Sequence, residues 1–198
     1  MVWAPDYVTA ADLEDFVRTS TGDAYIPGYG TAASRAVDEA CNRQFGQLAA
    51  AGTLTYDAGQ AAQLPNGRWL IMIDDVQDLT GVTVTVAGTA VAAGVDGYQW
   101  WERNAAVFGV PYIGLTFKDQ PAPGDLSVFA KFGWTAVPAA VPSAVRLQVN
   151  RWHIRRESPY GTAGAPSEGS EIRLSARLDP DVRSILAGAR IMRQRMPR

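Results

Sequence analysis

Apolar residues recur with two different periods along the chain, and the change of period divides it into three parts. Up to about residue 50, and again from about residue 138, apolar side chains repeat every three to four positions, as in amphipathic helices. Over 52–134 they alternate with polar side chains, as in strands that bury one face. The pattern predicts an α+β protein, a small helical bundle that carries an inserted antiparallel β module.

Two helices are predicted within 1–50. Thr9-Ala-Ala-Asp12 resembles a capping box, because the Thr9 hydroxyl can accept a hydrogen bond from a backbone N–H of the first turn. A second helix is predicted over 32–48. Its apolar face consists of Ala33, Ala36, Val37, Ala40, Cys41, Phe45 and Leu48. Cys41 lies on this face and is expected to be a small core residue.

Six short strands are predicted in the middle of the chain, and Gly- or Pro-containing turns separate them. None of the connections contains a crossover helix, so antiparallel pairing is expected. The predicted strands are 53–56, 69–73, 82–86, 98–101, 113–117 and 126–130.

Two further helices are predicted after the β module. The first covers 138–160, and the loop over 161–178 includes a stretch, 171–177, that alternates charged and apolar residues like an exposed strand. Asp179-Pro-Asp181 then opens a basic C-terminal helix over 179–198, since Pro and acidic residues suit a first turn. The whole chain, 1–198, is expected to form one domain.

Composition supports a folded protein outside the membrane. The chain has 198 residues, of which 47% are hydrophobic and 19% charged, enough apolar side chains for a core. No apolar stretch approaches the roughly 20 residues that cross a bilayer, and the N-terminus lacks the pattern of a signal peptide. The single cysteine excludes an intrachain disulfide. We therefore expect a soluble, intracellular-type protein that does not associate with membranes.

Charge is distributed unevenly along the chain. Residues 1–145 contain 15 acidic and 7 basic side chains, whereas 146–198 contain 5 acidic and 11 basic ones, all arginines. Such separation indicates opposite potentials for two different neighbours. Nucleic-acid binding, with Trp152 and Tyr160 stacking on bases, is disfavoured because the aromatic residues lie mainly in the acidic β region and the pI is about 5.4. A protein partner with an acidic surface fits better.

Two stretches of the chain partly match ligand-binding motifs. The stretch 28–33 has the spacing of a dinucleotide-binding GxGxxA motif, with Asp57 as a candidate ribose ligand, but no strand of adequate length precedes it. Glycines of a loop that leads into a helix explain these residues more simply. Asp74, Asp75 and Asp78 could bind a hard cation, but they lack the spacing of an EF-hand loop and suit a solvated turn.

No pattern indicates catalysis. His153 is the only histidine, and a general base needs a nucleophile and an orienting carboxylate beside it. The P-loop, GxSxG and HExxH signatures do not occur. We expect no catalytic residues, no metal, no cofactor and no enzymatic activity.

Two regions resemble the head-to-tail connector (adaptor) proteins of long-tailed bacteriophages, particularly those of actinobacterial-type hosts. The first is 126–161, with Leu126-Ser-Val-Phe-Ala-Lys-Phe-Gly-Trp134, Val137-Pro138, Pro142-Ser-Ala-Val-Arg-Leu-Gln-Val149, Arg151, Arg155-Arg156 and Ser158-Pro-Tyr-Gly161. The second begins with Leu178-Asp-Pro-Asp-Val182 and continues to about residue 191. Over the rest of the chain, the order of elements is similar to that of the family.

The resemblance implies a structural virion protein of the neck, present in the host cytoplasm during assembly. Members of this family form a ring with copies of themselves, usually twelve, between the portal protein and a downstream stopper or tail-side neck protein. Genomic DNA passes through the ring, and an acidic channel lining would bind no phosphates. The implied fold is a helical bundle with a β insertion.

The resemblance also suggests interaction residues. In the family the C-terminal segment docks on the portal, which here implies Arg183, Ile185, Leu186, Arg190, Arg193, Arg195 and Arg198. A candidate inter-subunit face on the 138–160 helix consists of Arg146, Asn150, His153, Arg156 and Glu157. A closed ring needs a heterologous interface, for which the separated acidic and basic regions supply complementary faces.

Two alternatives stay open at this point. One is a different neck protein, such as a tail-completion or stopper protein. The other is a hydrolase or carbohydrate-binding module with Tyr98, Trp100 and Trp101 as a stacking platform. Trp and Tyr in strands more commonly anchor a core or an interface.

Overall fold

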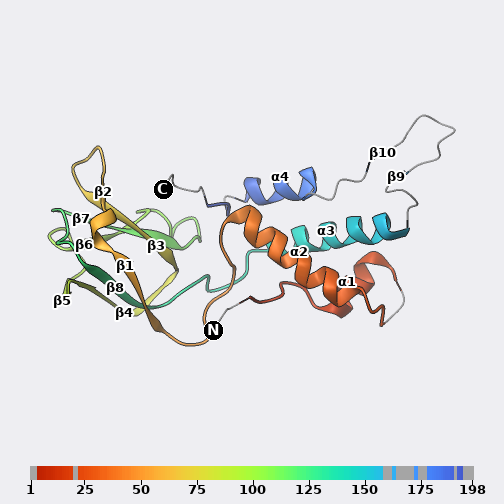
Figure 1. Cartoon of the computed structure of the whole chain (residues 1–198), viewed down its shortest axis with the longest axis horizontal. Helices are drawn as coiled ribbons and strands as arrows, with labels where there is room; N and C mark the ends of the chain where they lie inside the picture. The colour runs from red at the N-terminus through yellow and green to blue at the C-terminus, as the bar shows by residue number, and fades with distance from the viewer. Residues whose placement is uncertain are drawn as a thin grey trace. The chain divides into compact units, whose positions relative to one another are not determined.

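The helices and the β-sheets form two separate compact units. The computed structural model describes residues 4–19, 22–157, 162–163, 172–173, 178–189 and 191–193. Residues 1–45 and 137–198 make up the helical unit, and residues 46–136 make up the β module, which is inserted between them. Figure 1 shows helices α1 to α4 in the first unit and strands β1 to β8 in the second. The α+β class predicted from the periodicity is confirmed.

The helical unit is built around one central helix. Helix α3 (Ala140–Glu157) packs against α1 (Ala10–Val17), α2 (Ile26–Cys41) and α4 (Pro180–Gly188). In Figure 1, α4 runs along one side of α3, and α1 and α2 lie on the other. The core of the unit consists of fully buried side chains from all four helices, among them Leu13, Ile26, Val37, Val141, Val145, Val149, Val182 and Leu186.

Local capping explains where α1 begins. The Thr9 hydroxyl accepts a hydrogen bond from the Asp12 backbone N–H at 3.2 Å, as the capping-box pattern predicts. The helix ends at Val17, and Arg18 caps it in a left-handed conformation (φ 57°), with its N–H donating to carbonyls of the last turn.

Helix α2 does not occupy the predicted range of 32–48. It begins six residues earlier, with Pro27 in the first turn, where a missing N–H costs nothing. Gly30 lies inside the helix. A Cβ there would be 2.8 Å from the Leu13 side chain, so this glycine permits close packing with α1. The helix ends at Cys41, and Asn42 caps it in a left-handed conformation (φ 51°).

The C-terminal helix is shorter than the predicted 179–198. Asp179 caps it as expected, because its carboxylate accepts a hydrogen bond from the Asp181 N–H at 2.8 Å. Helix α4 ends at Gly188, with no basic residue in its last turn. Beyond it, Ile191 is buried and the Arg193 N–H donates to the Cys41 carbonyl at 2.9 Å. These tertiary contacts hold 191–193 in a non-helical conformation.

The segment between α3 and α4 is described only in part. Strands β9 (Thr162–Ala163) and β10 (Ile172–Arg173) pair antiparallel. Most of the strand expected over 171–177 lies outside the described residues.

The β module contains two four-stranded antiparallel sheets. One has the order β1-β8-β4-β5 and the other β2-β3-β7-β6. All six predicted strands are present, and β2 and β5 are two-residue additions. Side chains from both sheets form one buried cluster, so the sheets face each other across a shared core. The strands are β1 (Gly52–Asp57), β2 (Ala62–Gln63), β3 (Trp69–Val76), β4 (Asp78–Val86), β5 (Thr89–Ala90), β6 (Tyr98–Trp101), β7 (Tyr112–Phe117) and β8 (Asp125–Lys131); the short 3-10 helix η1 (Ala58–Gln60) follows β1.

The two ends of the β module are hydrogen-bonded to each other. The Trp134 N–H donates to the Gly46 carbonyl at 2.8 Å, and its indole N–H donates to the buried Asp75 carboxylate at 3.0 Å. Gly133, which precedes Trp134, has φ 107°, and a Cβ at this position would lie 2.1 Å from the Gly46 carbonyl oxygen. Only glycine therefore fits where the incoming and outgoing segments cross.

Candidate functional site

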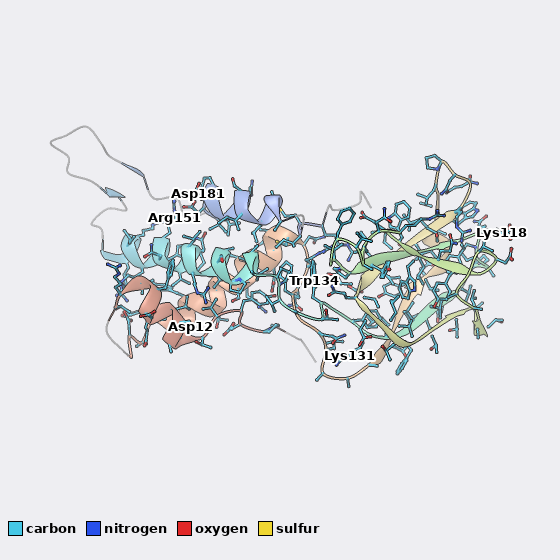
Figure 2. The ribbon with its side chains drawn as sticks, turned by 180° about the vertical axis from the view of Figure 1, so that it is seen from behind. Asp12, Lys118, Lys131, Trp134, Arg151 and Asp181 are labelled. Carbon is cyan, nitrogen blue, oxygen red and sulfur yellow. The ribbon has the colours of Figure 1, made fainter. Side chains whose placement is uncertain are left out.

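The C-terminal helix is anchored to α3 by one aspartate. The Asp179 N–H donates to Gln148 Oε1 at 3.0 Å, and the Asp179 carboxylate forms an ion pair with Arg151. Figure 2 shows Arg151 on α3 beside the start of α4, where Asp181 is labelled. Because Asp179 also caps α4, the same residue starts the helix and fixes it to its neighbour.

The residues predicted to dock on a portal are split between the core and the surface. Leu186 is fully buried within the helical unit, Ile185 is half-buried and Arg183 is exposed. Arg193 is half-buried. Arg190, Arg195 and Arg198 lie outside the described residues. Helix α4 thus packs into the helical unit through Leu186, and the docking role of 179–198 stays a prediction.

The five residues of the predicted inter-subunit face have different environments. Arg146 and Asn150 are half-buried and His153 is buried. Arg156 forms an ion pair with Asp23 at 3.3 Å and lies over the Tyr25 ring, 4.6 Å from its centre. The side chain of Glu157 lies outside the described set. Part of this face therefore serves internal contacts.

The contact with Arg156 contributes to a lowered pKa of Asp23, which belongs to the N-terminal part of the chain. The Tyr25 backbone N–H is the main cause that lowers the pKa of Asp23, and Arg156 lowers it further. The fold thus brings acidic and basic residues together that are far apart in sequence.

An open groove of about 420 Å³ lies between α1 and α3. Phe16 and Leu147 are its apolar residues, and they remain 41% and 36% exposed. Its charged residues are Asp12 and Asp15 on α1 and Arg146 on α3, and Ser143 completes the lining. Figure 2 labels Asp12 in the helical unit. The groove combines an apolar centre with charges of both signs.

The sequence shows Phe16 only as an apolar residue at helical spacing from Leu13. It contained no sign that Phe16 and Leu147 would remain exposed together. The exposure depends on how α1 crosses α3, which a helical period does not encode.

A half-buried polar cluster ties the N-terminal segment to α2. The Tyr7 hydroxyl donates to the Asp38 carboxylate and accepts from the Phe45 N–H at 3.0 Å. Arg35 pairs with Asp38 at 3.2 Å. Burial raises the pKa of Asp38, although Tyr7 and Arg35 act in the opposite direction. Burial and the bond to Asp38 raise the pKa of Tyr7. The cluster serves to hold the chain end in place.

The two candidate ligand motifs do not form sites. Residues 28–33 lie within α2, so the glycines are neither a phosphate loop nor the loop expected before a helix. Asp74 accepts from the Tyr56 hydroxyl at 2.9 Å, Asp75 binds the Trp134 indole, and Asp78 accepts from the Thr80 N–H at 3.0 Å. Among the residues that the structure describes, no group of three acidic, His or Cys side chains could hold a metal ion.

The aromatic residues of β6 do not form one open platform. Tyr98 is buried, and the Trp100 ring packs edge-on against it with 5.7 Å between centres. Trp100 also packs against Tyr112 at 5.4 Å. Trp101 is half-buried and lies opposite Gly114 in the pairing of β6 with β7. Tyr98 and Trp100 thus belong to the packing of the module.

The solved structures that are similar to this chain include two from gene transfer agent particles. No protein-family model and no curated protein matches the chain. A chain from the neck of an empty gene transfer agent (GTA) particle, computed with C6 symmetry, is 18% identical with a TM-score of 0.47; the match covers 100% of this chain and 95% of that one. A chain from the virion of a native GTA particle is 20% identical with a TM-score of 0.42, covering 84% and 87%.

Both TM-scores are below 0.5, so neither similarity assigns a family or a function to this chain. Within the described part of the chain, no helix is long and apolar enough to span a bilayer.

Proposed function

We propose that this chain is a structural protein of a phage-type neck, a non-enzymatic head-to-tail connector that forms a ring between the portal and the tail. The observation that carries the proposal is the layout of the chain. The residue-level resemblance of 126–161 and 178–191 implies a helical bundle with a β insertion, and the chain has a helical unit interrupted by an antiparallel β module. The two similar solved chains come from a neck and a virion.

The distribution of charge between the two units supports a ring with unlike faces. The β module contains eight acidic and four basic residues, a formal charge of −4. The helical unit contains twelve acidic and fourteen basic residues, a formal charge of +2. Heterologous contacts join two different surfaces of one chain, and opposite potentials favour such pairing. An acidic module beside the DNA path would let DNA slide, because it neutralises no phosphates.

The proposed partners are further copies of the chain, the portal protein and a tail-side neck protein, with DNA passing through without sequence-specific binding. On this proposal the exposed part of α4, which includes Arg183, is offered to the portal, while the buried Leu186 holds the helix to its own chain.

The proposal is tested by mass photometry of the purified chain, alone and with a purified portal ring, followed by negative-stain imaging. Closed rings of about twelve copies, or recruitment of that number onto a portal ring, are expected. A chain that stays monomeric in both conditions would refute the connector function. Rings that do not bind the portal but bind a stopper or tail component would favour another position in the neck.

A further inference from the structure

The connection between β6 and β7 is a hydrogen-bonded turn that presents two apolar side chains. Val107 N–H and Phe108 N–H donate to the Asn104 carbonyl at 3.0 and 3.2 Å, and Val110 N–H donates to the Ala105 carbonyl at 3.0 Å. Ala105 is buried beneath the turn. At its tip, Val107 is 82% exposed and Phe108 is 58% exposed. We call this pair the 107–108 knob.

The knob has the features of a binding anchor. Single exposed apolar residues are common on protein surfaces, but Val107 and Phe108 are adjacent on a turn that its own backbone bonds hold in shape. An anchor that is already ordered loses little conformational entropy when it binds. Apolar side chains that fill a pocket on a partner supply most of the binding energy of many interfaces.

The groove between α1 and α3 combines apolar surface with charges of both signs, which suits an apolar anchor that is flanked by charged residues. Its exposed Phe16 and Leu147 offer apolar surface at the centre, within a space of about 420 Å³. Its charged residues include Asp15 on one wall and Arg146 on the other. Among the described residues, Asp15 and Arg146 have no ion-pair partner.

Charges beside the knob match those of the groove. Glu102 and Arg103 precede the turn, and both are exposed. The structure gives Arg103 one hydrogen bond, to Gln99 at 3.3 Å. An arrangement in which Arg103 meets Asp15 while Glu102 meets Arg146 would pair opposite charges on both sides of the apolar contact.

We propose that the 107–108 knob of one copy inserts into the α1/α3 groove of a second copy. The knob and the groove are different surfaces, so the contact is heterologous and can repeat from copy to copy around a ring. The inference rests on the proposed connector function, from which it takes a second copy as the occupant, and it names the surfaces that close the ring.

Disulfide trapping tests the contact directly, because the chain has a single cysteine and Cys41 is fully buried. One variant contains Val107→Cys and a second contains Leu147→Cys. Mixed under mild oxidation, these two variants should form a covalent dimer. A chain with both substitutions should form a ladder of linked species.

Matched controls use exposed apolar residues away from the contact. In one control mixture, Val95→Cys takes the place of Val107→Cys. In the other, Ile154→Cys, which lies on α3 like Leu147, takes the place of Leu147→Cys. We expect the mixture of Val107→Cys and Leu147→Cys to cross-link at least tenfold faster than either control mixture. Equal rates, or Val107→Cys variants that link mainly to one another, would overturn the inference.

Exchanging the charges of Arg103 and Asp15 provides a second test, which needs no covalent bond. Arg103→Glu should weaken self-association at least tenfold, measured by mass photometry, and adding Asp15→Arg should restore it. An unchanged affinity in the single variant, or no recovery in the double variant, also counts against the contact. If rings form on a portal but the Val107→Cys and Leu147→Cys variants do not cross-link, this inference alone is wrong. Failure to assemble in every condition would remove the proposed function as well.

Discussion

Replacing Leu186 with alanine tests whether α4 is part of the core of the chain. The substitution removes carbon atoms that are fully buried, at about 0.8 kcal/mol each, or roughly 2.4 kcal/mol of transfer free energy. A cavity adds to this cost where the surroundings cannot collapse.

Helix α4 is held at both ends, which limits such collapse. Asp179 ties its start to Gln148 and Arg151, and the Arg193 N–H bonds to the Cys41 carbonyl beyond its end. We therefore expect Leu186→Ala to lower the free energy of unfolding by about 3–5 kcal/mol.

The assay is urea unfolding followed by far-UV circular dichroism, which reports the four α-helices, all of them in the helical unit. The control is Arg183→Ala on the exposed side of α4, which should change stability by less than about 0.5 kcal/mol. A loss below about 1 kcal/mol for Leu186→Ala would refute the packing argument and favour a detachable C-terminal arm.

Three further predictions concern single residues. Because the pKa of Tyr7 is raised in the folded state, the unfolded chain loses the Tyr7 proton first, so stability should fall by about 1.4 kcal/mol per pH unit above pH of about 10. Tyr7→Phe should reduce this slope in pH-dependent urea titrations, and an unchanged slope would contradict the assignment. Burial raises the pKa of the Cys41 thiol to about 12, so native protein should react with iodoacetamide far more slowly than urea-unfolded protein, and equal rates would show an accessible thiol. Gly133→Ala should lower the stability of the β module by at least about 3 kcal/mol, measured by unfolding followed with tryptophan fluorescence. The control Gly67→Ala, at φ 81° with open space around it, should cost about 1–2 kcal/mol. Similar losses in the two variants would mean that the crossing at Gly133 tolerates a side chain.

The sequence by itself determined the elements that depend on near neighbours. Thr9 and Asp179 cap helices through contacts within three residues, so their patterns were sufficient. The alternating apolar residues located all six main strands, and the lack of crossover helices indicated their antiparallel pairing. The burial of Cys41 followed from its position on an apolar helical face.

The tertiary structure decided whatever depends on residues far apart in the chain. Gly30 lies where the Leu13 side chain of α1 comes close to α2. Helix α4 ends early because 191–193 make contacts with the core of the helical unit and with α2. The sheet order β1-β8-β4-β5 joins strands that are distant in sequence. The candidate site belongs to this second group: the α1/α3 groove exists only because two distant helices cross, and periodicity within one helix cannot specify the angle or register of that crossing.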